Sequence, residues 1–135
     1  KISSIKPFEF SKGYLMTEQA KYNQILQELK DQESSIQALA LVDEKGKLYA
    51  SNLPEDIDVD AVSSVPYFAF SMFEKELSKF HSSHLKQIKI QGKEEYILLC
   101  SIKKNFLLAI WVATKEKTPQ LQQNVASAIS KILGA

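Results

Sequence analysis

Two short segments of this chain, residues 36 to 42 and residues 106 to 113, are almost wholly apolar, and they restrict the possible folds more than any other feature. Each has the length of a strand, and neither alternates between apolar and polar residues as a strand with one solvated face does. A strand that is apolar on both faces has to be covered on both faces. We therefore expect a sheet that has these segments as its central strands and carries helices on both sides.

The first central segment is expected to form a hairpin with the residues that follow it. The polar turn Asp43-Glu-Lys-Gly46 separates it from a second apolar segment, residues 47 to 51. Glycine adopts a positive φ without strain, and this property suits the tight turn of a hairpin.

Residues 85 to 91 and 95 to 101 precede the second central segment across polar turns, and the three segments together are expected to form a meander. Residues 85 to 91 alternate, with Ile88 and Ile90 on one face and polar side chains on the other. Such alternation predicts an edge strand, whose unpaired backbone groups accept a strand from another chain.

Amphipathic spacing predicts a first helix that follows the N-cap Thr17 and ends near Glu33. A last helix is expected to start at Thr118-Pro119 and to close at Gly134. Between the hairpin and the meander, a middle helix is expected to run to about Phe80.

Pro66 sets the expected start of the middle helix, because proline breaks a helix interior but is tolerated in the first turn. We therefore expect this helix to begin near Ser63 or Ser64 and not at Asp60. The predicted order of elements is αββαβββα. The chain of 135 residues fits one domain, over residues 17 to 135, preceded by an arm or linker at residues 1 to 16.

The middle helix carries more large apolar side chains than one sheet face covers. The stripe expected to face the domain's own sheet consists of Val65, Ala69, Met72 or Phe73, Leu77 and Phe80. The aromatic residues that remain are Tyr67, Phe68 and Phe70. Contiguous exposed aromatic residues mark partner surfaces, so we interpret this face as an interface. The alternative is that the amino-terminal arm or a crossing loop covers it.

The composition argues against several kinds of chemistry. All seventeen basic residues are Lys, so the chain has no arginine finger for phosphoryl transfer. The four glycines stand alone, which argues against a phosphate-binding loop, and no nucleophile-elbow pattern positions a serine for catalysis. The chain is therefore predicted to be non-enzymatic and to use no cofactor.

A metal site and a membrane span are not expected either. His81 and His84 have a helical spacing that suits a divalent metal, but no acid or cysteine lies nearby in sequence. The carboxylates of residues 55 to 60 lack the spacing of a calcium loop. Cys100 is expected to be a small buried residue. Because the longest apolar run has only eight residues, we predict no transmembrane segment. The single cysteine allows no disulfide framework within the chain, which is compatible with a reducing compartment, and we predict a cytoplasmic location.

Charge is unevenly distributed along the chain. Residues 1 to 80 carry nine lysines against thirteen acidic residues, whereas residues 81 to 135 carry eight lysines against three. The lysines of the meander are not interleaved with exposed aromatic residues, so we interpret them as solvated and predict no nucleic-acid partner. Lysines on an edge strand also oppose pairing with another chain. This effect conflicts with the expectation that residues 85 to 91 accept a strand from a partner.

The hairpin and the meander resemble the roadblock/LC7 family over residues 17 to 135. The segment Ala40-Leu-Val-Asp-Glu-Lys-Gly-Lys-Leu-Tyr-Ala-Ser51 is similar to the family pattern hydrophobic-hydrophobic-Asp-x-x-Gly-x-hydrophobic-x-Ala-Ser, and the meander from Lys86 through Val112 completes the likeness. The fold class is then α/β (α+β), profilin-like: one five-stranded, mostly antiparallel sheet with helices on both faces. The arm at residues 1 to 16 and the absence of arginine depart from the family.

The resemblance implies a dimer built from the middle helix and the edge strand, with the two sheets joined edge to edge. It also implies a scaffold or adaptor that binds or regulates a Ras-like small GTPase, or that acts in a motor or signalling complex, as a homodimer or as a heterodimer with a similar domain. Without arginine, a direct GTPase-activating role carried by an arginine is ruled out. The alternatives are a profilin-like small-molecule-sensing domain, which requires an interior pocket, and a longin-like trafficking domain. The predicted interface residues are Tyr67, Phe68, Phe70, Phe73, Gln87, Lys89 and Gln91.

Overall fold

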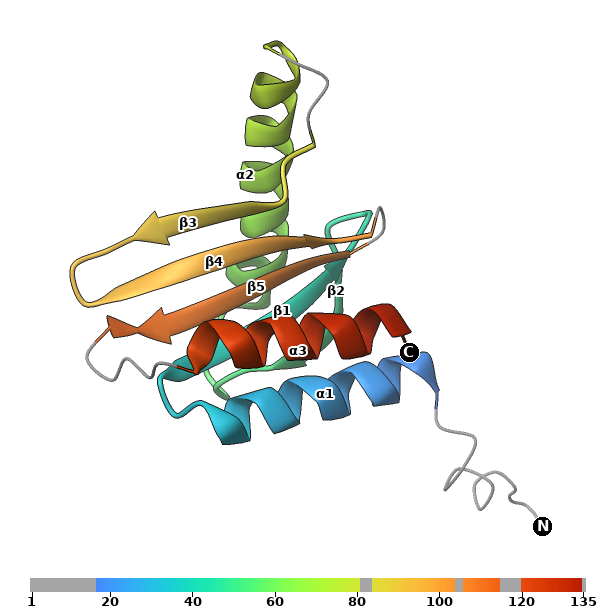
Figure 1. Cartoon of the computed structure of the whole chain (residues 1–135), viewed down its shortest axis with the longest axis vertical. Helices are drawn as coiled ribbons and strands as arrows, with labels where there is room; N and C mark the ends of the chain where they lie inside the picture. The colour runs from blue at the N-terminus through green and yellow to red at the C-terminus, as the bar shows by residue number, and fades with distance from the viewer. Residues whose placement is uncertain (1–16, 81–83, 104–105, 115–119, 135) are drawn as a thin grey trace.

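A computed structural model of the chain describes residues 17–80, 84–103, 106–114 and 120–134 (Figure 1). The elements, in order, are α1 (Glu18–Gln32), β1 (Ile36–Asp43), β2 (Leu48–Asn52), α2 (Val59–Ser78), β3 (Gln87–Gln91), β4 (Glu95–Ile102), β5 (Phe106–Ala113) and α3 (Leu121–Gly134). The predicted order αββαβββα and the predicted fold class are confirmed. The amino-terminal arm, His81 and the start of the last helix at Thr118-Pro119 lie outside the described residues.

The five strands form one antiparallel sheet in the order β2-β1-β5-β4-β3. The two apolar segments, β1 and β5, lie next to each other inside it, and Leu41 of β1 is paired with Leu108 of β5. Their predicted central position is confirmed. β3 lies at an edge of the sheet, also as predicted.

Helices cover both faces of the sheet (Figure 1). On one face α1 and α3 lie side by side, and Leu26, Leu29 and Ile132 are buried in the larger of two apolar clusters. On the other face α2 crosses the strands, and Val62 and Phe70 enter the smaller cluster. The central strands supply side chains to both clusters, and each fully buried side chain of this size contributes about 1.5–3 kcal/mol.

The first helix has the predicted ends. The Thr17 hydroxyl accepts a hydrogen bond from the Ala20 N–H at 3.1 Å, and Glu33 terminates the helix. Glu33 is itself buried, and its carboxylate accepts a hydrogen bond from the side-chain amide of Asn124. This polar contact links the carboxyl end of α1 to α3.

The middle helix begins earlier than predicted. Asp58 caps α2 by accepting a hydrogen bond from the Asp60 N–H at 3.0 Å, so Pro66 lies inside the helix. An interior proline removes one backbone hydrogen bond and costs about 3 kcal/mol. Pro66 lies on the buried face of α2, and the burial of its ring offsets part of that cost.

The face of α2 that meets the sheet also differs from the prediction. Val62, Pro66 and Phe70 are buried, whereas Val65 and Met72, predicted to face the sheet, are 62% and 61% exposed. The prediction that Phe70 is a surplus aromatic residue was wrong, because it is only 7% exposed and belongs to the smaller cluster. Both the face of α2 that carries Phe70 and the face that carries Val65 and Met72 are apolar. Residue spacing alone therefore does not show which of the two faces packs on the sheet.

Gly46 in the β1–β2 turn has a φ of +79°, and a Cβ at this position would lie 3.2 Å from Cδ2 of Tyr67. Gly46→Ala is expected to lower the free energy of unfolding by about 1–3 kcal/mol, measured by urea denaturation. Gly134→Ala is the matched control, because a Cβ there meets nothing within 4 Å. This control is expected to be neutral or stabilising by less than about 1 kcal/mol, and equal losses in both variants would contradict the explanation.

Candidate functional site

The apolar stripe of α2 continues past the edge of the sheet. After the buried residue Phe70, spacings of three and four residues lead to Phe73, Leu77 and Phe80, which we call the overhang. Figure 1 shows the carboxyl-terminal half of α2 projecting beyond β3. Phe73 and Phe80 are 54% and 76% exposed, because no strand of the described chain lies beneath them.

A groove of about 380 Å³ lies between the overhang and β3. Leu85 and Ile88 form its opposite wall. Ile88 and Ile90 are paired with Leu99 and Ile97, which belong to the cluster beneath α2, so both isoleucines lie on this face of the sheet. Ile90 is exposed, and the groove therefore continues as an apolar surface along the edge strand.

The polar side chains of β3 lie on the opposite face and contact their own chain. Gln87 accepts a weak hydrogen bond from the Cys100 thiol, with the sulfur 3.7 Å from Oε1. The Lys89 ammonium lies 4.4 Å from the centre of the Tyr96 ring. Gln91 donates to the Gly92 carbonyl at 3.0 Å.

Cys100 lies in β4, paired with Gln87 of β3, and is buried as predicted. Burial raises the pKa of its thiol to about 11, because the low-dielectric interior disfavours the thiolate. The thiol is therefore neutral near pH 7, and Cys100 acts as a small apolar residue with a weak S–H donor.

The backbone groups of β3 alternate between β4 and the free edge. The Lys86 carbonyl accepts a hydrogen bond from the Ser101 N–H at 2.9 Å, and the Gly92 N–H donates to the Glu95 carbonyl at 2.7 Å. In an antiparallel ladder, both backbone groups of a residue point to the same side, so the even-numbered residues face β4. Gln87, Lys89 and Gln91 face outward, where no described strand pairs with them.

Only some of the predicted interface residues come together. Phe73 and Gln87 both border the groove, although the Gln87 side chain lies on the opposite face of the sheet beside Cys100. Phe68 is exposed but lies outside the groove lining. Tyr67 is half-buried, and its hydroxyl donates to the Glu44 carbonyl at 2.7 Å. Phe70 lies in the chain's own core. The groove residues that were not among the predicted interface residues are Leu77, Phe80, Leu85, Ile88 and Glu76. The signal for the first two was their spacing from Phe70.

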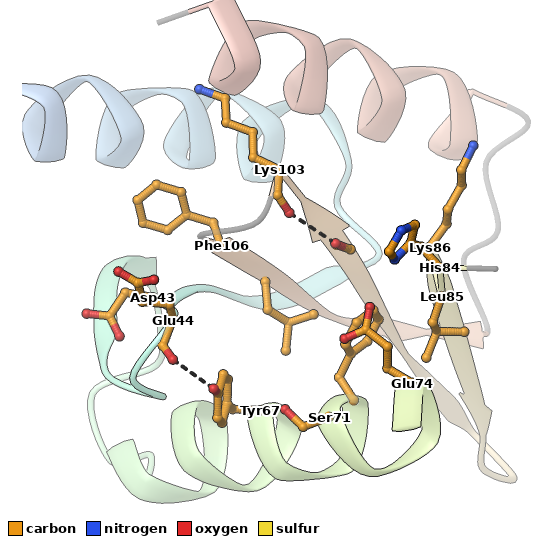
Figure 2. A pocket seen from close by; sticks show the side chains of 13 residues that line it. Asp43, Glu44, Tyr67, Ser71, Glu74, His84, Leu85, Lys86, Lys103 and Phe106 are labelled. Carbon is orange, nitrogen blue, oxygen red and sulfur yellow. Dashed lines mark hydrogen bonds between the residues drawn. The ribbon is translucent and has the colours of Figure 1, made fainter. Parts of the chain in front are cut away.

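A second hollow, of about 640 Å³, lies beside α2 near the β1–β2 turn. Figure 2 shows Tyr67, Ser71 and Glu74 of α2 along one side of it and Phe106 across from them. The amino groups of Lys86 and Lys103 point away from the hollow in this view (Figure 2). The small-molecule-sensing alternative requires an interior pocket, whereas this hollow is lined largely by exposed and half-buried residues.

The described residues contain no group of three side chains suited to hold a metal ion, and His84 is exposed. Within the same part of the chain, no helix has the length and apolar character needed to cross a membrane.

Comparison with known proteins identifies a family over two thirds of the chain. The model of the Roadblock/LC7 domain matches residues 21–111. MglB from Myxococcus xanthus superposes with a TM-score of 0.77 at 13% identity, over 84% of this chain and 93% of MglB. An MglB with a tetrameric arrangement gives 0.77 at 11% identity, over 87% and 89%. A Roadblock/LC7 domain from Streptomyces avermitilis gives 0.73 at 10% identity, over 82% and 92%. No curated protein sequence matches the chain.

Proposed function

Because the chain belongs to the Roadblock/LC7 family, we propose that it is a non-enzymatic, dimer-forming scaffold that holds or regulates a Ras-like small GTPase. The observation that carries the dimer is the overhang of α2. Its aromatic residues continue a buried stripe beyond β3, so a further strand beside β3 would lie beneath them.

A second copy of a similar domain supplies such a strand. In a two-fold arrangement each overhang covers the β3 strand of the other copy. The two copies then contact each other through the same surface, which consists of the overhang and β3. Burying a fully exposed phenylalanine side chain contributes about 1.5–3 kcal/mol. Phe73 and Phe80 are 54% and 76% exposed, so each copy gains the corresponding part of this free energy from them. The MglB that was solved in a tetrameric arrangement supports assembly of such domains.

The GTPase partner is supported by the family and by the surface outside the groove. Val65, Phe68 and Met72 are exposed apolar residues of α2 that do not line the groove, and they offer a contact surface on the dimer. Because every basic residue is Lys, the scaffold contributes no arginine to phosphoryl transfer and acts by holding the GTPase. We propose that residues 17 to 135 form the domain that makes the dimer and GTPase contacts, and that residues 1 to 16 are an arm outside it. We also propose that the protein acts in the cytoplasm.

The overhang variant Phe73→Glu/Phe80→Glu tests the dimer. Both side chains are already more than half exposed, so the fold is expected to persist. Self-association, measured by sedimentation velocity at tens of micromolar, is expected to weaken by about 30-fold or more, as for a central interface residue worth ~2 kcal/mol. Lys75→Glu adds the same charge elsewhere on α2 and is expected to behave as wild type. A monomeric wild-type protein would contradict the dimer, and an unaffected double variant would contradict its formation through the overhang.

GTPase binding is tested separately with purified Ras-like GTPases from the same genome, each loaded with GDP or a non-hydrolysable GTP analogue. At least one is expected to bind, and Phe68→Glu is expected to weaken that binding without dissociating the dimer, because Phe68 lies outside the groove lining. Dimerisation without binding of any GTPase in either state would refute the partner and leave the dimer intact.

A further inference from the structure

The sequence of β3 reads the same in both directions: Gln87-Ile88-Lys89-Ile90-Gln91. Antiparallel pairing of two copies about a two-fold axis at Lys89 therefore places Ile88 opposite Ile90 on the apolar face and Gln87 opposite Gln91 on the polar face. A two-fold interface requires a self-complementary surface, and this palindrome provides one.

The free backbone groups fit the same register. The backbone N–H and C=O groups of Gln87, Lys89 and Gln91 point toward the free edge. In this register these three residues of one copy pair only with the same three residues of the other copy. Each such pair exchanges two hydrogen bonds, as in a narrow antiparallel pair. A register shifted by two residues in either direction leaves one of these three without an outward-facing β3 partner, so the register centred on Lys89 forms the most bonds.

The register has one electrostatic cost. It places the two Lys89 residues directly opposite each other, with Cα atoms about 5.5 Å apart. Like charges at opposed positions destabilise a pair of strands, and an edge lysine commonly prevents pairing.

The position of the Lys89 side chain removes much of this cost. Its ammonium lies 4.4 Å from the centre of the Tyr96 ring. Tyr96 belongs to β4, so Lys89 extends inward over its own sheet and away from the free edge. The face of an aromatic ring attracts a cation, and the buried Tyr96 side chain offers its ring at a fixed position. In a dimer each Lys89 ammonium lies over the Tyr96 ring of its own chain, and the two ammonium groups are therefore held apart.

We propose that the partner of β3 is a second copy of this chain paired about Lys89, and that Tyr96 is a positioning residue that holds the Lys89 ammonium off the edge so that pairing occurs. This inference rests on the proposed self-association and specifies its partner and its register.

The register is tested by single cysteine variants of the full chain under mild oxidation. Lys89→Cys places two thiols at a Cα separation that a disulfide tolerates, so a covalent dimer is expected. Gln87→Cys alone is the matched control, because its two copies lie several residues apart and are not expected to cross-link. The native Cys100 is buried and does not compete. Cross-linking through Gln87→Cys but not through Lys89→Cys would overturn the register.

The role of Tyr96 is tested by sedimentation at low and high salt. Tyr96→Leu frees the Lys89 ammonium and is expected to weaken self-association at least tenfold, with partial recovery in salt because screening reduces the repulsion. Tyr96→Phe keeps the ring and is expected to match wild type. Lys89→Met/Tyr96→Leu is expected to associate within about twofold of Lys89→Met, because no charge remains to be positioned.

The outcomes separate the inference from the proposed function. Tyr96→Leu is compared in two backgrounds, the wild-type chain and the Lys89→Met variant. If it weakens association equally in both, Tyr96 acts through packing alone and the positioning role is wrong. If Tyr96→Leu associates as wild type, that role is also wrong, although the dimer stands. A wild-type protein that remains monomeric refutes the dimer itself.

Discussion

Burial of β1 and β5 on both faces is the constraint on which the other elements of this domain depend. Two helices, α1 and α3, lie side by side along one face and cover it, whereas the other face has α2 alone, and α2 crosses the strands. A crossing helix covers part of each strand, so Ile97 and Trp111 remain half-buried and Ile90 is exposed. The same crossing carries the end of α2 past β3. The end of α2 and the edge strand β3 therefore keep exposed apolar surface, because one helix that crosses a five-stranded sheet does not cover the whole face.

Sequence patterns predicted those parts of the fold that depend on local chemistry. The Asp43 to Gly46 turn, the N-cap at Thr17 and the alternation in β3 each have a local cause, and the structure has all three. The start of α2 was predicted wrongly from Pro66, because the propensity rule did not include the burial of the proline ring. Phe70 was placed on the wrong face, because α2 is apolar at more than one helical phase.

The candidate site was only partly predictable for a different reason. Spacing along a helix shows which residues share a face, but it does not show where the sheet beneath that face ends. Phe73 and Phe80 share a stripe with Phe70, yet only Phe70 lies above the chain's own strands. The lysine of β3 was ambiguous for a related reason, because an edge lysine blocks or permits pairing according to the direction of its side chain. That direction depends on Tyr96 in the neighbouring strand.

Hydrogen exchange at the β3 amides tests most directly the claim that this edge pairs with a second copy. The amides of Gln87, Lys89 and Gln91 face outward, and those of Ile88 and Ile90 face β4. If the edges pair, the three outward amides are protected at high protein concentration and exchange rapidly on dilution, while the two inward amides stay protected throughout. Rapid exchange of the outward amides at every concentration, in a protein that otherwise remains folded, would contradict the claim.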